Sequence, residues 1–191
     1  DSATPPFSED QRVDQPRSLY AATKAANELM AYTYAQLYGL RATGLRFFTV
    51  YGPWGRPDMA PLLFSRAVLA GRSIEVFNEG RMQRDFTHVS DIVAGILGAL
   101  AHPATDPVPH RVFNLGNHTP VELERFIAVI EQAAGRPAQK VYKPMQPGDM
   151  VRTMADTRRA RDAFGFDATT PIEQGLPPVV AWCRDYFGER A

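Results

Sequence analysis

Helix-like and strand-like segments alternate along this chain, and that alternation limits the possible folds more than any other feature of the sequence. Apolar or small residues at helical spacing predict helices over 17–38, 61–70, 90–101, 120–134, 156–164 and 171–187. Short runs of β-forming residues predict strands over 41–51, 74–77, 84–88, 112–115 and 140–142. Such alternation is typical of the α/β class.

Capping residues and prolines predict several of these boundaries. Gly39 is expected to end the first helix. Ser90 and Asp156 are expected to cap the amino ends of helices, because their side-chain oxygens accept hydrogen bonds from free backbone N–H groups. Pro177 and Pro178 are expected to kink or interrupt the last helix, since proline lacks the N–H that a helix interior uses.

The composition argues against several classes of protein. The 191 residues, 45% of them hydrophobic, suffice for one domain, or for one domain and a lobe. The net charge of zero argues against a nucleic-acid-binding surface. The single cysteine, Cys183, excludes an internal disulfide, and its apolar neighbours predict a buried packing thiol. No membrane span, signal peptide or metal-ligand spacing is visible, so we expect a cytoplasmic protein without a metal.

Tyr20 and Lys24 are the most informative pair of side chains in the sequence. They lie four residues apart in the helix expected over 17–38, so both leave the same helix face about one turn apart. An ammonium beside a phenol stabilises the phenolate, which indicates an activated tyrosine base. The spacing alone is a weak motif, and a tyrosine resting on a helix face is the structural alternative.

A glycine-rich dinucleotide-binding turn is missing from the sequence. No G-x-G-x-x-G lies between an expected strand and an expected helix. A nucleotide-binding turn of that kind is therefore not within these 191 residues.

The sequence around Tyr20 resembles a known family. The runs 18–30 and 45–59 are similar to those of the extended short-chain dehydrogenase/reductase family, and within it to nucleotide-sugar epimerases, above all UDP-glucuronate 4-epimerases. The similarity continues, in family order, through 6–10, 82–88, 113–116, 146–149 and 172–176.

The resemblance implies a partial Rossmann-like fold that lacks the amino-terminal glycine-rich half and carries the small α/β substrate-binding lobe. Residues 1–60 would be the remnant of the NAD-binding domain, with the Tyr20–Lys24 helix. Residues 61–191 would be mainly the UDP-sugar lobe, with some segments returning to the first domain. The missing part, roughly 100 residues, would include the glycine-rich turn and a Ser/Thr that binds the substrate hydroxyl.

The resemblance also implies roles for residues near the reacting sugar. Tyr20 would be the acid/base that removes the proton from the sugar 4-hydroxyl, and Lys24 would support the phenolate and bind the nicotinamide ribose of NAD. Thr49, expected at the carboxyl end of a strand, and Arg56, whose guanidinium suits a carboxylate, would face an acidic sugar. The alternatives are a threonine bonded to its own backbone and an exposed loop arginine.

A second set of residues would bind the nucleotide. By resemblance, Arg84 would contact the UDP diphosphate, with Asp85 orienting it, and the stretch from Glu75 to Phe77 would meet the uracil. Asp149 would accept hydrogen bonds from the ribose. Gln146 replaces an arginine that binds phosphate in many sugar epimerases, so Arg152 is the candidate substitute.

The sequence therefore predicts the carboxy-terminal part of an NAD-dependent epimerase that interconverts UDP-glucuronate and UDP-galacturonate, with a place in polysaccharide biosynthesis. Another UDP-sugar epimerase, a dehydratase or a decarboxylase of the same superfamily is the alternative enzyme. A non-catalytic UDP-sugar-binding fragment is the alternative from another class. Family members often dimerise through the helix that carries the Tyr/Lys pair, which makes 17–38 a candidate homodimer interface.

Overall fold

The computed structural model describes residues 4–16, 18–146 and 149–188, so Arg17 of the first expected helix and Pro147 and Gly148 of the 146–149 run lie outside it. The described helices are α1 (Leu19–Tyr38), α2 (Ala60–Leu69), α3 (Val89–Ala101), α4 (Leu123–Ala134), α5 (Arg158–Phe164), α6 (Ile172–Phe187) and the 3-10 turn η1 (Asn78–Gly80). The strands are β1 (Ala42–Phe47), β2 (Thr49–Tyr51), β3 (Ser73–Phe77), β4 (Gln83–Arg84), β5 (Phe86–His88), β6 (His110–Leu115), β7 (Val121–Glu122) and β8 (Gln139–Lys143).

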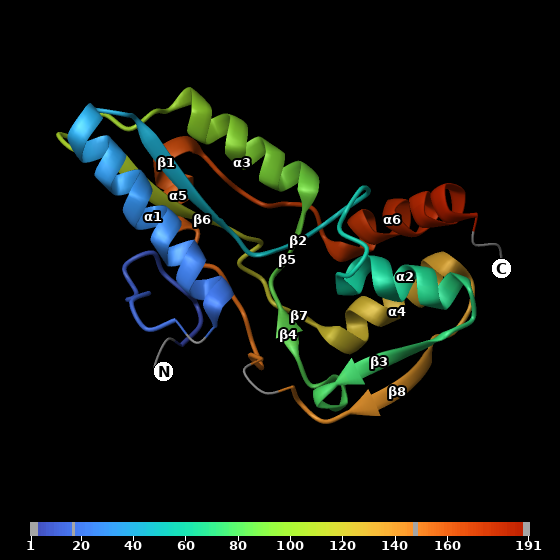
Figure 1. The fold of residues 1–191 in the computed structure, drawn as a ribbon. Coiled ribbons are helices and arrows are strands. Elements are labelled where there is room, and N and C mark those ends of the chain that lie inside the picture. The colour runs from blue at the N-terminus through green and yellow to red at the C-terminus, as the bar shows by residue number, and fades with distance from the viewer. Residues whose placement is uncertain (1–3, 17, 147–148, 189–191) are drawn as a thin grey trace.

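At one end of the molecule, a parallel pair of strands lies between two helices (Figure 1). β1 pairs with β6 in parallel, with Leu45 opposite Phe113 and Phe47 opposite Leu115, and α1 and α3 flank the pair. A small core of Ile92, Phe113, Leu115 and further residues fills the space toward α3 and α5. Within the described part of the chain β1 forms a ladder with β6 alone, so its second edge carries no strand.

At the other end, α2, α4 and α6 pack together beside the parallel pair β3–β8 (Figure 1). Their shared core includes Phe126, Leu176 and Val179, each fully buried. Cys183 belongs to this core and is fully buried as well, which confirms the packing thiol that its neighbours predict. The alternation of segments thus builds an α/β fold as expected.

The expected strand 41–51 is wrong as a single element, because it divides at Phe48. β1 pairs with β6, whereas β2 pairs in parallel with β5, so the chain changes ladders at this residue. The Phe48 N–H still donates to the Leu115 carbonyl at 3.1 Å, and the Thr49 N–H donates to the Asp85 carbonyl at 3.1 Å. The segment 84–88 divides in the same way at Asp85, between β4 and β5. A run of β-forming residues does not reveal where its partner changes.

Two helix starts also differ from expectation. His88, not Ser90, is the N-cap of α3, and its Nδ1 accepts the Ser90 N–H at 3.3 Å. The helix expected from Pro120 begins only at Leu123, because Val121–Glu122 pair with β4 as the antiparallel strand β7. In both cases a neighbouring strand extends further than the capping signal suggests.

The last two helices show how packing modifies local signals. Thr157 is the N-cap of α5, although Asp156, immediately before it, still accepts the Arg158 N–H at 3.2 Å. α6 runs through Pro177 and Pro178 without interruption. Residues on its buried face, which line the core shared with α2 and α4, hold the helix together across the two missing N–H groups.

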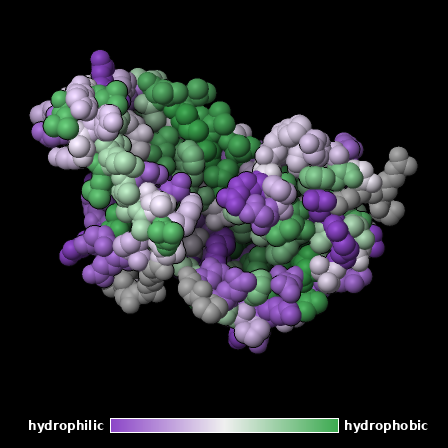
Figure 2. Space-filling model, viewed as in Figure 1, coloured by the Kyte–Doolittle hydropathy of each residue, from purple (hydrophilic) through white to green (hydrophobic). Residues whose placement is uncertain are grey.

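α1 leaves most of its apolar side chains at the surface. Ala35 is its one buried residue, whereas Leu29, Met30 and Leu37 are 69%, 56% and 66% exposed. Apolar side chains also gather over α3 (Figure 2), where Leu97 is 60% exposed. The two helices that flank the β1–β6 pair thus both carry exposed apolar side chains. None of the helices in the described ranges is long and apolar enough to cross a membrane.

Candidate functional site

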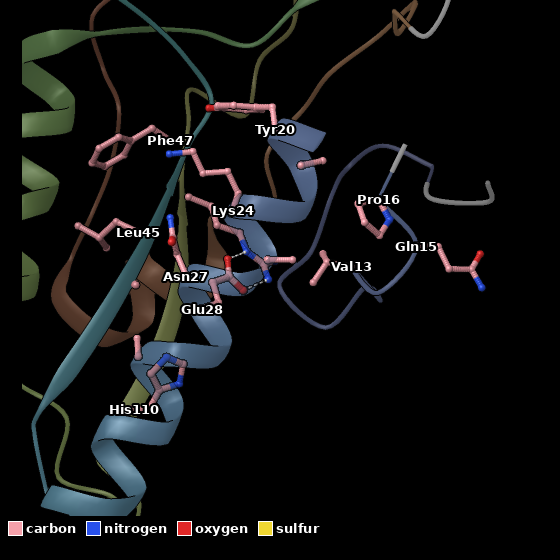
Figure 3. Close-up of a pocket in the computed structure, with 15 residues that line it drawn as sticks. Val13, Gln15, Pro16, Tyr20, Lys24, Asn27, Glu28, Leu45, Phe47 and His110 are labelled. Carbon is pink, nitrogen blue, oxygen red and sulfur yellow. Dashed lines mark hydrogen bonds and ion pairs between the residues drawn. The ribbon is translucent and has the colours of Figure 1, made fainter. Parts of the chain in front are cut away.

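Tyr20 and Lys24 lie on one face of α1, as their spacing predicts. Ser18 caps the helix by accepting the Ala21 N–H at 3.1 Å, which fixes the first turn from which Tyr20 projects. The Lys24 ammonium lies 5.3 Å from the centroid of the Tyr20 ring. Tyr20 is 70% exposed, and Lys24 points from α1 toward Phe47 at the end of β1 (Figure 3). The phenol and the ammonium are therefore both open to a ligand.

A cavity of about 730 Å³ lies between α1, β1 and the loop before α1. Its lining includes Tyr20, Lys24, Asn27, Glu28, Gly44, Leu45, Phe47 and His110 (Figure 3). It is large enough to admit part of a nucleotide-sized ligand, since ligand pockets usually measure about 300–1,000 Å³. Residues 44–47 of β1 and His110 of β6 form its sheet side.

An ion pair that the sequence does not reveal holds α1 against β1. Arg46 donates from Nε and from its terminal nitrogen to the two Glu28 carboxylate oxygens, at 2.7 Å each. The Arg46 hydrogen bonds and charge lower the pKa of Glu28. A bidentate pair of this kind fixes an orientation as well as a distance. It sets the position of the Tyr20 helix relative to the strand below it.

Arg56 lies in the exposed loop between β2 and α2. Its Nε donates to Asp58 at 3.1 Å, and Asp58 raises the pKa of the Arg56 guanidinium through hydrogen bonding and charge. Arg56 is not among the residues that line the cavity beside Tyr20.

Thr49 stands at the point where the chain leaves β1. The sequence predicts Thr49 near the end of one continuous strand. In the structure Thr49 lies just beyond the carboxyl end of β1 and is the first residue of β2. Thr49 is partly buried, and its backbone is fixed by the Asp85 carbonyl. Along the chain, Thr49 lies between β1, which packs against the Tyr20 helix, and the loop that carries Arg56.

Arg84 and Asp149 form an ion pair. The Arg84 terminal nitrogen lies 2.7 Å from Asp149 Oδ1, and the Arg84 side chain is only 17% exposed. A second Arg84 nitrogen donates to the Gln83 carbonyl at 3.1 Å. Arg152 lies beside this pair, because it bridges to Gln83 of β4, but its guanidinium contacts Met154 sulfur at 3.7 Å. The three polar side chains expected at the nucleotide thus gather at β4.

Asp85 does not orient Arg84, which corrects the expectation for this residue. Its fully buried carboxylate accepts four hydrogen bonds, from the Thr87 hydroxyl and from the backbone N–H groups of Asn117, His118 and Ala155, at 2.6–3.1 Å. It therefore ties β5 to the loop after β6 and to the segment before α5. An R-D dipeptide gives no hint that its acid turns inward.

Glu75 and Phe77 lie on β3, away from Tyr20. Glu75 is exposed and 3.7 Å from the Lys143 ammonium on β8, whereas Phe77 is partly buried against the core of that end. η1 joins β3 to the β4 segment, so these two residues belong with Arg84 rather than with Tyr20. Among the described residues, no three His, Cys, Asp or Glu side chains are placed to hold a metal ion.

The fold and the Tyr20–Lys24 pair place the chain in a family. Residues 1–116 match the model of the NAD dependent epimerase/dehydratase family, and the chain belongs to that family. A probable UDP-glucuronate 4-epimerase of Rhizobium meliloti is 45% identical over 193 residues, covering 93% of this chain and 56% of that protein. The chain thus spans little more than half of that relative's length.

Solved structures share the fold. MoeE5 in complex with UDP-glucuronic acid and NAD is 34% identical, with a TM-score of 0.84, over 93% of this chain and 59% of that one. The UDP-glucuronic acid 4-epimerase of Bacillus cereus, in complex with UDP-glucuronic acid and NAD, is 28% identical, with a TM-score of 0.86, over 94% of this chain and 56% of that one. The fold is the α/β, Rossmann-like fold of these epimerases, of which the chain represents a part.

Proposed function

We propose that this chain is the part of an NAD-dependent UDP-sugar 4-epimerase that holds the sugar and its proton acceptor, and that the sugar pair is UDP-glucuronate and UDP-galacturonate. One observation carries the proposal. Tyr20 and Lys24 share one exposed face of α1, and both line a large cavity. The relatives named above, which act on UDP-glucuronate or bind UDP-glucuronic acid, support the choice of substrate.

Tyr20 is the group that moves the proton. With the sugar 4-hydroxyl at the phenolate oxygen, Tyr20 takes the hydroxyl proton and returns it when the epimeric hydroxyl forms. Lys24, over the Tyr20 ring, supplies the positive charge that favours the phenolate. Both groups are exposed, so their closure from water requires the bound ligand or further polypeptide.

Thr49 and Arg56 make the site suited to an acidic sugar. A guanidinium can make two parallel hydrogen bonds to a carboxylate, and the Thr49 hydroxyl can add a third. Arg56 is held by Asp58 in the absence of ligand, so a substrate carboxylate would compete with Asp58 for the same donors. A neutral hydroxymethyl group in place of the carboxylate could not replace Asp58 as the charged partner of Arg56.

The nucleotide lies, in this proposal, along β4 and β3. Arg84 is largely buried and already oriented by Asp149, so its guanidinium is preorganised for a diphosphate. Asp149 would bind the ribose, Arg152 would supply a second positive charge, and Glu75 and Phe77 would border the uracil. Arg84 and Asp149 form an ion pair with each other in the structure, so the two side chains already lie together in the proposed nucleotide site.

The residues present fit one side of an NAD site. The cavity beside Tyr20 and Lys24 is lined by 44–47 of β1, and within the described residues the second edge of β1 carries no strand, so a larger sheet could continue there. NAD, when bound, supplies the acceptor and donor of the hydride at the sugar carbon. Lys24 would hold the nicotinamide ribose, while the glycine-rich turn is not in this chain.

The same proposal divides the chain by role. Residues 1–60 belong to the cofactor domain and 61–191 mainly to the sugar lobe, with α3, β6 and α5 returning to pack at the cofactor end. We propose that the exposed apolar side chains of α1 form the interface with a second copy of the chain in a homodimer. We place the enzyme in the cytoplasm.

An NMR product assay on a longer polypeptide that carries this chain and the glycine-rich half, loaded with NAD, tests the proposal. UDP-glucuronate should be converted to UDP-galacturonate, and UDP-glucose should react far more slowly. Arg56→Lys keeps the charge but loses the bidentate geometry, so it should lower turnover of the acidic sugar selectively. Turnover of the neutral sugar alone would refute the roles of Thr49 and Arg56.

The open β1 edge favours a second reading of the 191 residues taken alone. Because no strand of the described residues covers that edge, the chain alone would be a UDP-sugar-binding fragment that neither retains NAD nor epimerises. Incubation of the chain with UDP-glucuronate and NAD should leave the sugar unchanged. Formation of UDP-galacturonate would show that the fragment is catalytic.

A further inference from the structure

Three aromatic rings join the Arg56 loop to the last helix. The Trp54 ring lies 5.2 Å from the Trp182 ring and 5.1 Å from the Tyr186 ring, centroid to centroid. Trp182 and Tyr186, one turn apart on α6, are stacked on each other at 5.1 Å. We call these three rings the aromatic clamp.

The backbone of the loop shows why such a contact is needed. Trp54 has a φ of 64°, in the left-handed region that residues other than glycine rarely adopt. Residues 54–59 are all exposed, and inside this stretch the recorded backbone hydrogen bond joins the Met59 N–H to the Arg56 carbonyl. A conformation of this kind persists only where the surroundings hold it. The rings on α6 are the surroundings that Trp54 contacts.

The other end of the loop is also fixed. A Cβ at Gly52 would lie 2.4 Å from a methyl carbon of Val89, so only glycine allows the loop to leave β2 so close to α3. Gly55 has room for a Cβ only at 3.2 Å from the Gly52 carbonyl and from Leu62. The path from Gly52 to Arg56 is therefore held at its start by backbone packing and at Trp54 by the clamp.

Arg56 follows Trp54 by two residues and depends on this path. Its side chain is 74% exposed, and its partner Asp58 belongs to the same loop, so that ion pair moves with the loop and does not anchor it. Trp182 is anchored, since it packs against the core shared by α2, α4 and α6. The core therefore fixes Trp182 on α6, the rings of Trp182 and Tyr186 fix Trp54, and Trp54 fixes the position of Arg56 two residues later.

We infer that the aromatic clamp of Trp54, Trp182 and Tyr186 positions Arg56 over the sugar and so sets the preference for an acidic over a neutral UDP-sugar. The inference rests on the proposed function, because it gives Arg56 a substrate carboxylate to bind. The clamp residues are positioning residues, and none of them needs to touch the sugar. The specificity of the site is then partly determined on α6, at the far end of the chain.

The test uses Tyr186→Ala in the longer, NAD-loaded protein, with Tyr186→Phe as the control that keeps the ring. Tyr186 is 58% exposed, so its truncation leaves the core intact. Loss of one of the two rings that hold Trp54 should lower the ratio of kcat/KM for UDP-glucuronate to that for UDP-glucose about fivefold. In an Arg56→Ala background, Tyr186→Ala should change that ratio no further, because the residue through which the clamp acts is absent.

A second readout does not depend on the substrate. In protein labelled with 5-fluorotryptophan, the Trp54 resonance is assigned by Trp54→Phe, and it should move toward the position of solvent-exposed fluorotryptophan in Tyr186→Ala but not in Tyr186→Phe. An unmoved resonance in Tyr186→Ala, or an equal loss of selectivity in the Arg56→Ala background, overturns the inference. A wild-type protein without preference for the acidic sugar refutes the proposed function instead, and the fluorine measurement then decides whether the clamp holds the loop.

Discussion

Replacing Asp85 by asparagine should destabilise the chain by a predictable amount. Each Asp85 carboxylate oxygen accepts two hydrogen bonds in a fully buried position. Oδ2 faces two backbone N–H groups, from His118 and Ala155, neither of which can reverse its role. Oδ1 faces the Asn117 N–H and the Thr87 hydroxyl, and the hydroxyl can rotate to accept.

The amide of Asp85→Asn will therefore place its NH₂ group at the Oδ1 position. In that orientation the Thr87 hydroxyl accepts from the amide, and only the Asn117 N–H loses its acceptor. A hydrogen bond to a charged acceptor is worth about 1.5–3 kcal/mol, so we expect a loss of about 2–3 kcal/mol in the free energy of unfolding. With a urea m-value of about 2 kcal/mol per molar, the unfolding midpoint falls by about 1 M.

Urea unfolding followed by far-UV circular dichroism measures this shift. The matched control is Thr87→Val, which removes one hydroxyl donor, keeps the carboxylate, and should cost about 1 kcal/mol. A midpoint for Asp85→Asn within about 0.2 M of wild type would refute the claim that this carboxylate anchors three segments.

Three further predictions concern packing and charge. Gly175→Ala places a Cβ 2.2 Å from the Tyr51 hydroxyl oxygen and should lower the free energy of unfolding by more than about 2 kcal/mol. Adding Tyr51→Phe should recover part of that loss, because the nearest ring atom is then 2.8 Å from the new Cβ. Equal thermal stability of the single and double variants would contradict this steric explanation. Burial lowers the pKa of His88 below 6.5, so the unfolded chain binds the proton more readily, and the fold loses stability as the pH falls from 6.5 toward the lowered pKa. His88→Asn, which can still cap α3, should reduce the difference in the free energy of unfolding between pH 7 and pH 5 in urea titrations. An unchanged difference would contradict this role of His88. Arg46 lowers the pKa of Glu28, so their pair stabilises the fold above the unfolded pKa of 4.5, and this stability is lost as the pH falls through the lowered pKa of the folded state. Glu28→Gln should therefore cost about 1 kcal/mol in the free energy of unfolding at pH 7 and progressively less in urea titrations below pH 4.5. No difference at pH 7 would rule the pair out as an anchor.

Local sequence signals predicted the elements of this fold well and their partners poorly. Helical spacing and Gly39 placed α1 within two residues, because these signals act within a single helix. The break at Phe48 depends on which strand lies opposite, β6 or β5, and no residue within the run 41–51 encodes that choice. The cap of α3 moved to His88 for the same reason, since β5 extends up to it.

The candidate site shows the same division. Tyr20 and Lys24 were found from their spacing because one helix carries both. Arg84 and Asp149 were each expected near the nucleotide, but their direct pairing, across 65 residues, belongs to the tertiary fold. Asp85 and the rings of Trp182 and Tyr186 carried no recognisable signal, because a buried anchor and a remote support look like any acid or aromatic in a sequence.

The two strand breaks have a joint consequence. Phe48 and Asp85 interrupt neighbouring segments, and the Thr49 N–H bonds the Asp85 carbonyl, so the breaks lie side by side and form a crease across the molecule. Tyr20 and Lys24, the proposed proton-handling pair, precede the break at Phe48, and Arg84 directly precedes the break at Asp85. A substitution that shifts the main chain at either break would therefore change the distance between the Tyr20 helix and Arg84, the two parts of the proposed ligand site.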